Sequence, residues 1–118
     1  MTRYMILICG DEKQWEAMSA EERRRLDQAH QDFGTRAGSA ILAAGELEPT
    51  STATTLKRGS DATPTITDGP FLESKEVVGG FYLIEADNLD EVIKLTSGLY
   101  EVSAEHSGVE IRPLVDHG

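Results

Sequence analysis

One histidine has the type and position that proton-transfer chemistry needs. His30 follows Ala29 on an apolar stripe that includes Leu26 and Phe33. An imidazole that is partly buried on such a stripe titrates near neutrality and suits a general base. Asp27 lies three residues earlier, on the same flank of the expected helix, where it can orient the ring. The alternative is a boundary histidine that packs by its ring and hydrogen-bonds to water.

The carboxylate of Asp68 is the candidate partner of His30 in an acid–base pair. Asp68 opens the turn Asp68-Gly69-Pro70-Phe71 at the end of an expected strand. It either faces a cleft beside a subunit interface or bonds the backbone of its own turn, as Asp does in many turns. Gly69 is expected to adopt a conformation that other residues disfavour, and Phe71 is expected to anchor the turn in the core.

Three further charged residues are candidate ligand contacts: Glu46, Lys75 and Arg112. Glu46 would face the same cleft. Lys75 would hold an anionic group of a ligand or form a solvated pair with Glu73 or Glu76. Arg112 would clamp a carboxylate or pair with an acid on a neighbouring strand. No pair of histidines has the spacing of a zinc site, and Gly79-Gly80 lacks the pattern of a phosphate-binding loop, so we expect neither metal nor cofactor.

These residues need elements to position them, and the sequence predicts seven. Ser19-Ala20-Glu21-Glu22 matches a capping box and opens a long helix that ends at Gly45, through the inward-facing Ile41 and Ala44. A second helix follows Asn88. The strands are expected at residues 4–9, 52–57, 62–67, 81–84 and 109–113, and the second and third of these form a hairpin.

The element order favours an α+β fold. Without the hairpin it is β-α-β-β-α-β, the ferredoxin-like split arrangement with two helices on one face of an antiparallel sheet. The segments 4–9 and 81–84 are apolar on both strand faces, and the uncovered face should not meet water. The sequence therefore predicts a homodimer that closes face against face as a dimeric α+β barrel, with the hairpin added to it.

Composition excludes several classes of function. The 118 residues suit one domain, over residues 1–118, and carry a formal net charge of -10. Such a chain repels phosphate backbones and anionic membrane surfaces, so nucleic-acid binding is not expected. No apolar run approaches the roughly 20 residues of a membrane helix, and no secretory signal is recognisable at the start. A single cysteine fits a reducing compartment, and we expect a cytoplasmic protein.

Seven segments, spread over nearly the whole chain, carry a resemblance to a known family: Arg3–Ile8, Ser19–Glu22, Thr52–Thr55, Thr67–Phe71, Glu73–Glu76, Gly79–Ile84 and Val109–Pro113. Together they resemble the DGPF-domain family of the YCII-related superfamily. The resemblance implies a dimeric ferredoxin-like barrel in the bacterial cytoplasm, in a family with no agreed activity. Some members are linked with extracytoplasmic-function sigma factors. Better-known relatives carry a His and an Asp as an acid–base pair; His30 is similar to that histidine, and the aspartate has no clear counterpart here.

Three hypotheses on function follow. The first is a small-molecule-binding or regulatory module, linked to sigma-factor regulation, whose pocket takes a small polar ligand. The second is a small cofactor-independent enzyme that uses His30 and Asp68 on a polar metabolite. The third is a structural or interaction domain. A pH-dependent activity that follows an imidazole would favour the enzyme, whereas stabilisation by a metabolite without turnover would favour the binding module.

Overall fold

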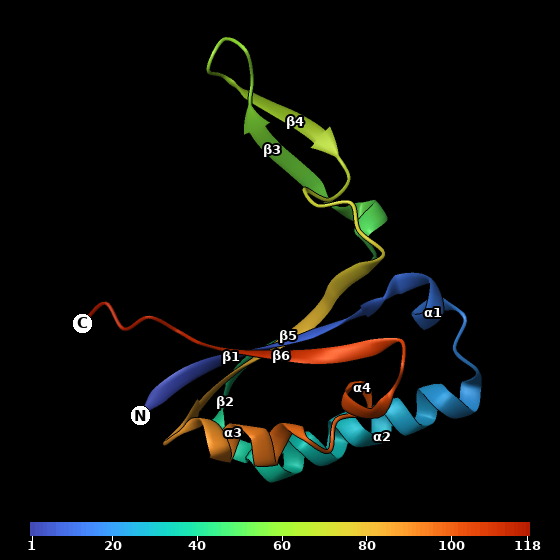
Figure 1. Ribbon diagram of the computed structural model, residues 1–118, viewed down its shortest axis with the longest axis vertical. Helices are drawn as coiled ribbons and strands as arrows, with labels where there is room; N and C mark the ends of the chain where they lie inside the picture. Colours follow the sequence, from blue (N-terminus) through green and yellow to red (C-terminus); the bar gives the residue numbers. More distant parts are fainter.

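A four-stranded antiparallel sheet forms the body of the protein. The computed structural model describes residues 1–118, and its sheet has the strand order β2-β5-β1-β6 (Figure 1). The strands are β1 (Thr2–Asp11), β2 (Ile41–Glu46), β5 (Glu76–Ala86) and β6 (Ser107–Pro113). Every neighbouring pair is antiparallel. This order and the helices between the strands give the predicted split β-α-β arrangement of an α+β fold.

The helices cover one face of this sheet (Figure 1). They are α1 (Glu12–Glu16), α2 (Ala20–Ala37), α3 (Leu89–Thr96) and α4 (Tyr100–Ser103), with short 3-10 turns at Gly38–Ala40 and Thr50–Thr52. The predicted capping box is confirmed at its first half, because the Ser19 side chain accepts from the Glu22 amide. Asn88 caps α3 in the same way at the Glu91 amide. None of the helices is long and apolar enough to span a membrane.

The core lies between the sheet and the helices, and alternation along the strands explains it. Tyr4, Ile6 and Ile8 of β1 are buried on the helix side, with Ile84 of β5 and Phe33 of α2. Residues two apart in a strand share a face. The intervening residues of β1 and β5 therefore share the opposite face, which no helix covers; they are the half-buried Met5, Leu7, Cys9, Phe81 and Leu83. We call this the open face.

The long helix is shorter than the sequence predicted, and the last part of it is a strand. The helix α2 ends at Ala37, and its C-cap Gly38 has φ +52°, a left-handed conformation that favours glycine. Ile41 to Glu46 then form β2 at the edge of the sheet. The prediction of a helix through Ala44 was wrong because Ile41 and Ala44 continue the helical spacing. In the structure both residues belong to the edge strand β2, which pairs with β5.

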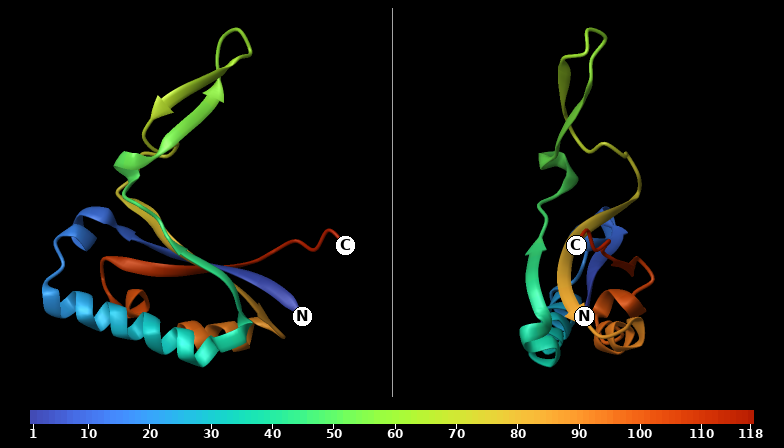
Figure 2. Two further views of the ribbon diagram at one scale, coloured as in Figure 1. Left: turned by 180° about the vertical axis from the view of Figure 1, so that it is seen from behind. Right: turned by 90° about the vertical axis from the view of Figure 1, so that its left-hand side faces the viewer.

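The predicted hairpin exists and stands away from the body. It consists of β3 (Thr54–Arg58) and β4 (Pro64–Asp68), which pair only with each other. We call residues 54–72 the arm. Both Figure 1 and Figure 2 show it projecting from the ends of β2 and β5, on the side of the sheet opposite the helices. Phe71, at its base, is 68% exposed, so the expectation that it anchors the turn in the core was wrong.

Candidate acid–base site

A cavity of about 590 Å³ lies between the helices α1 and α2 and the strands β2 and β5. One wall is formed by α1 and α2, and the other by the ends of β2 and β5 from which the arm departs. Its apolar lining includes Ile8, Trp15, Leu26 and the aromatic part of Tyr82. Polar groups converge on it from several elements: Glu12, Glu16, Arg23, Asp27, His30, Glu46, Glu48, Tyr82 and Glu101. A partly apolar hollow with a few convergent polar groups is the usual form of a small-molecule site.

His30 is held by both of its ring nitrogens at the wall of this cavity. Its Nε2 lies 2.8 and 2.9 Å from the two carboxylate oxygens of Glu101. Its Nδ1 lies 2.7 Å from the hydroxyl oxygen of Tyr82. The side chain is 22% exposed, so the ring is mostly buried and still forms part of the cavity lining. His30 lies on the fourth turn of α2, opposite the centre of β5, and this position brings its imidazole to Tyr82 and Glu101.

The carboxylate of Glu101 determines the tautomer of His30. Glu101 lies in the first turn of α4 and is only 3% exposed. A carboxylate only accepts hydrogen bonds, so Nε2 of the imidazole carries the proton that Glu101 receives. In the neutral ring Nδ1 is then an acceptor, and the Tyr82 hydroxyl donates to it. The result is a directed chain from Tyr82 through His30 to a buried negative charge.

Tyr82 completes the chain from the middle of β5. It is opposite Ile6 in β1 and Ala44 in β2, which places its side chain on the helix face of the sheet. Its ring packs against Phe33, with centroids 4.5 Å apart, and stacks near His30 at 5.8 Å. Burial raises the pKa of the Tyr82 hydroxyl, and the negative charge of Glu101 raises this pKa further. Tyr82 therefore keeps its proton throughout the neutral range.

Negative charge dominates the rest of the lining. Six carboxylates line the cavity against one guanidinium, Arg23. That guanidinium also donates to the backbone oxygen of Trp15, at 2.8 Å. Glu12 accepts from the hydroxyl and the amide of Thr50, and these bonds lower the pKa of the Glu12 carboxyl. The lining is thus negatively charged at neutral pH, apart from Arg23 and any charge on His30.

The structure brings together two of the five residues proposed from the sequence. His30 and Glu46 both line the cavity, and Asp27 does so as well. Asp68 ends β4 on the arm and is not part of the lining, so the structure does not bring it to His30.

Lys75 and Arg112 lie elsewhere, each in an ion pair. The Lys75 amine is 3.6 Å from the carboxylate of Asp11, not from Glu73 or Glu76; the Lys75 side chain is 81% exposed, whereas Asp11 is buried. Arg112 is opposite Met5 and so lies on the open face, where it donates to Glu110 on its own strand. The pair of Arg112 and Glu110 is exposed on both sides, and exposed pairs contribute little to stability.

The two residues that hydrogen-bond to His30, Glu101 and Tyr82, were not among the site residues proposed from the sequence. Tyr82 is part of an apolar run that reads as core, and its hydroxyl gives no separate signal. Glu101 lies 71 residues from His30 along the chain. No local spacing connects two residues at such a separation; only the packing of α4 beside α2 does.

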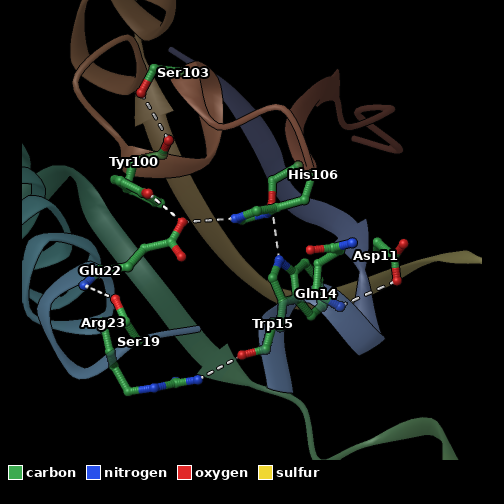
Figure 3. Close-up of polar contacts among 10 residues, drawn as sticks. Asp11, Gln14, Trp15, Ser19, Glu22, Arg23, Tyr100, Ser103 and His106 are labelled. Carbon is green, nitrogen blue, oxygen red and sulfur yellow. Dashed lines mark hydrogen bonds and ion pairs between the residues drawn. The ribbon is translucent and has the colours of Figure 1, made fainter. Parts of the chain in front are cut away.

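A second polar network lies beside the cavity and includes Trp15, one of the lining residues (Figure 3). The Tyr100 hydroxyl donates to Glu22, and Nε2 of His106 lies 3.1 Å from the same carboxylate. Nδ1 of His106 is 2.6 Å from the Ser107 hydroxyl, which in turn accepts from the indole N–H of Trp15 at 2.8 Å. The network ties the start of α2 to the start of β6 and holds Trp15 in place. No group of three or more His, Cys, Asp or Glu side chains is placed to hold a metal ion.

Comparison with known proteins identifies the family. The model of the YCII-related domain matches residues 2–117, so the chain belongs to this family. An uncharacterised protein of Rhizobium meliloti (strain 1021) is 35% identical over 114 residues, which are 94% of this chain and 90% of that protein. Among solved structures, 5-chloro-2-hydroxyhydroquinone dehydrochlorinase from Burkholderia phenoliruptrix AC1100, in complex with 2,5-dihydroxybenzoquinone, matches with a TM-score of 0.48 and 18% identity. This match covers 100% of this chain and 96% of the other.

Proposed function

We propose that this YCII-related protein binds a small polar molecule in the cavity beside α2 and transfers a proton to or from it. The observation that carries the proposal is the chain Tyr82–His30–Glu101. An imidazole whose tautomer is fixed by a buried carboxylate, and whose other nitrogen meets a hydroxyl, is the arrangement that general acid–base sites use. The cavity supplies the place where a ligand would meet this chain.

The proton would move through the Tyr82 hydroxyl. A bound molecule gives a proton to the Tyr82 oxygen while the original hydroxyl proton passes to Nδ1 of His30. Tyr82 ends neutral, so its raised pKa does not oppose the step. His30 ends as imidazolium, and the Glu101 carboxylate at 2.8 Å stabilises that charge. The reverse transfer returns the proton to another atom of the molecule.

The charge of the lining selects the class of ligand. Six carboxylates disfavour a polyanion by like-charge repulsion, which is strong where water is partly excluded. A neutral polar molecule or a cation is therefore the better fit. Arg23 offers one place for a carbonyl or a single negative group.

A second candidate function is a binding module without turnover, in a regulatory role. Both nitrogens of His30 are already paired inside the protein, as in a purely structural hydrogen-bond network. The same cavity would then recognise a ligand and report it through a change in assembly or partner binding.

We also propose that the protein is a homodimer formed through the open face, closed as an α+β barrel. Met5, Leu7 and Leu83 present apolar side chains there, on the side that no helix covers. A sheet face of this kind is normally covered. Light scattering at micromolar concentration should give about twice the 12.9 kDa chain mass.

Ligand screening followed by isotope exchange tests the function. A thermal-shift screen of polar metabolites, neutral, cationic and anionic, identifies molecules that stabilise the protein. Each stabilising molecule is then incubated with the protein in D2O, and proton NMR reports loss of a carbon-bound proton. We expect exchange with the natural chain and none with Tyr82→Phe, which keeps the ring and the packing. Stabilisation without exchange or turnover would favour the binding module, and no stabilisation by any class would contradict both.

A further inference from the structure

The single chain exposes more surface than a compact protein of its size. Its accessible surface is 8257 Å², whereas a folded monomer of 12.9 kDa exposes roughly 6,300 Å². The radius of gyration is 16.4 Å, against about 13.5 Å for a compact domain of this length. The excess is about 2,000 Å² for each chain. The single chain therefore leaves exposed a surface that a compact domain of its size would bury.

The arm is exposed along most of its length and has little to stabilise it within its own chain. Two-stranded hairpins are at best marginally stable in water on their own. Leu56 and Ile66 are cross-strand partners and so share one face of the hairpin. Their side chains are 63% and 70% exposed. The arm therefore presents an apolar pair on a ribbon that needs another surface to pack on.

The direction of the arm points to a second copy of this chain as that surface. The arm rises from the ends of β2 and β5 on the side of the open face, away from the helices, in all views (Figures 1 and 2). A partner seated on the open face would occupy the space beside the arm. By two-fold symmetry the partner's arm would lie beside this chain in the same way.

We infer that the arm is a clasp, which packs the Leu56 and Ile66 face on the body of the partner subunit. This inference rests on the homodimer proposed above and adds the element that holds it together. The area agrees with it: about 2,000 Å² from each chain gives about 4,000 Å² in total, within the roughly 2,000–5,000 Å² of obligate homodimers. The open face by itself is less apolar than the open face together with the arm, because it carries the charged pair Glu110 and Arg112 on β6.

Two matched double variants test the clasp. Leu56→Asp with Ile66→Asp places two charges on the apolar face of the arm, and Thr65→Asp with Thr67→Asp places two charges on its other face. Light scattering over a dilution series should show the first variant dissociating at concentrations roughly tenfold or more above the natural chain. The second should match the natural chain. Far-ultraviolet circular dichroism checks that each variant keeps its fold.

Proteolysis of the natural chain gives a test that needs no variant. Trypsin cleaves after Lys57 and Arg58, near the tip of the arm. Packing on a partner should protect these bonds at high protein concentration and release them on dilution, while cleavage at the exposed Lys94 on α3 stays constant. Leu7→Asp, on the open face, should dissociate the dimer without touching the arm.

The outcomes separate the two proposals. A natural chain that is monomeric at all concentrations overturns both the dimer and the clasp. A dimer that survives the Leu56 and Ile66 substitutions, with tryptic cleavage of the arm independent of concentration, overturns the clasp and leaves the dimer standing. Loss of the dimer in the first double variant alone, with concentration-dependent protection, supports the clasp.

Discussion

The indole of Trp15 lies directly against the backbone of Gly79. A Cβ atom on Gly79 would meet ring atom Cζ3 of Trp15 at 2.5 Å, a distance that no real contact allows. The indole cannot move aside freely, because its N–H is bonded to Ser107. Gly79 is therefore required by close packing at the wall of the cavity.

Substitution of Gly79 by Ala should destabilise the protein by roughly 1–3 kcal/mol, as overpacking does. The matched control is Gly34→Ala in α2, where a Cβ would meet nothing within 4 Å. That change should be neutral or stabilise by up to about 1 kcal/mol, since Ala favours a helix interior. Urea unfolding midpoints compare the two. Equal midpoints for both variants would show that the Trp15 side chain moves aside without cost, and would contradict the prediction.

His30→Ala should cost stability as well as function. It leaves the buried Glu101 carboxylate without its partner, and an unsatisfied buried polar group costs roughly 1–3 kcal/mol. Glu101→Gln should cost less, because the amide oxygen still accepts from Nε2. Thermal unfolding of the two variants at pH 7 provides the comparison. A smaller loss for His30→Ala than for Glu101→Gln would mean that Glu101 is solvated.

Glu22 should make stability fall in acid. Bonds from Tyr100 first, and then from His106, lower the pKa of the Glu22 carboxyl in the folded state. Its stabilising effect is therefore complete above the ordinary glutamate pKa of about 4.3, and is lost as the pH falls through the lowered folded value. Glu22→Gln should flatten the decline between pH 5 and the acid limit. Glu21→Gln, on the exposed neighbour, should leave the decline of melting temperature with pH unchanged.

Replacement of Gly69 should destabilise the protein because of the backbone conformation at this position alone. Its φ is +109°, and a Cβ there would meet no other atom within 4 Å. Gly69→Val should cost roughly 1–3 kcal/mol, as strained backbone does. Since the turn belongs to the arm, the loss should appear in the dissociation of the dimer on dilution. An unaltered dimer and an unaltered unfolding midpoint would show that the turn relaxes without cost.

Local signals in the sequence predicted most of the elements. The sequence carries no comparable signal for contacts between residues that are far apart in the chain. Ser19 and Asn88 mark helix starts through bonds to residues three positions on, which spacing reveals. The required conformation of Gly69 was predicted for the same reason. The strand β2 was missed because its apolar residues also fit a helix, and only pairing with β5 decides between the two.

Two of the proposed residues, His30 and Glu46, lie at the site, and the groups that hydrogen-bond to His30 were not predicted. His30 stood out by type and position, and Glu46 by following a glycine. Glu101 and Tyr82 complete the hydrogen-bonded chain from other elements, and sequence separation hides such contacts. Asp68 was chosen as partner because it ends a strand, but that strand belongs to the arm and not to the sheet that faces His30.

The position of β1 in the sheet constrains how the protein folds during its synthesis. This strand is synthesised first, yet its two neighbours, β5 and β6, come from the last part of the chain. The apolar stretch Tyr4–Ile8 therefore has no strand partner until residues 76–86 have been made, and one of its edges stays unpaired until residue 113. Non-local pairing of this kind slows folding relative to proteins whose contacts are mostly local. Removal of β6 should leave a chain that aggregates, because the central strand would present an unpaired edge.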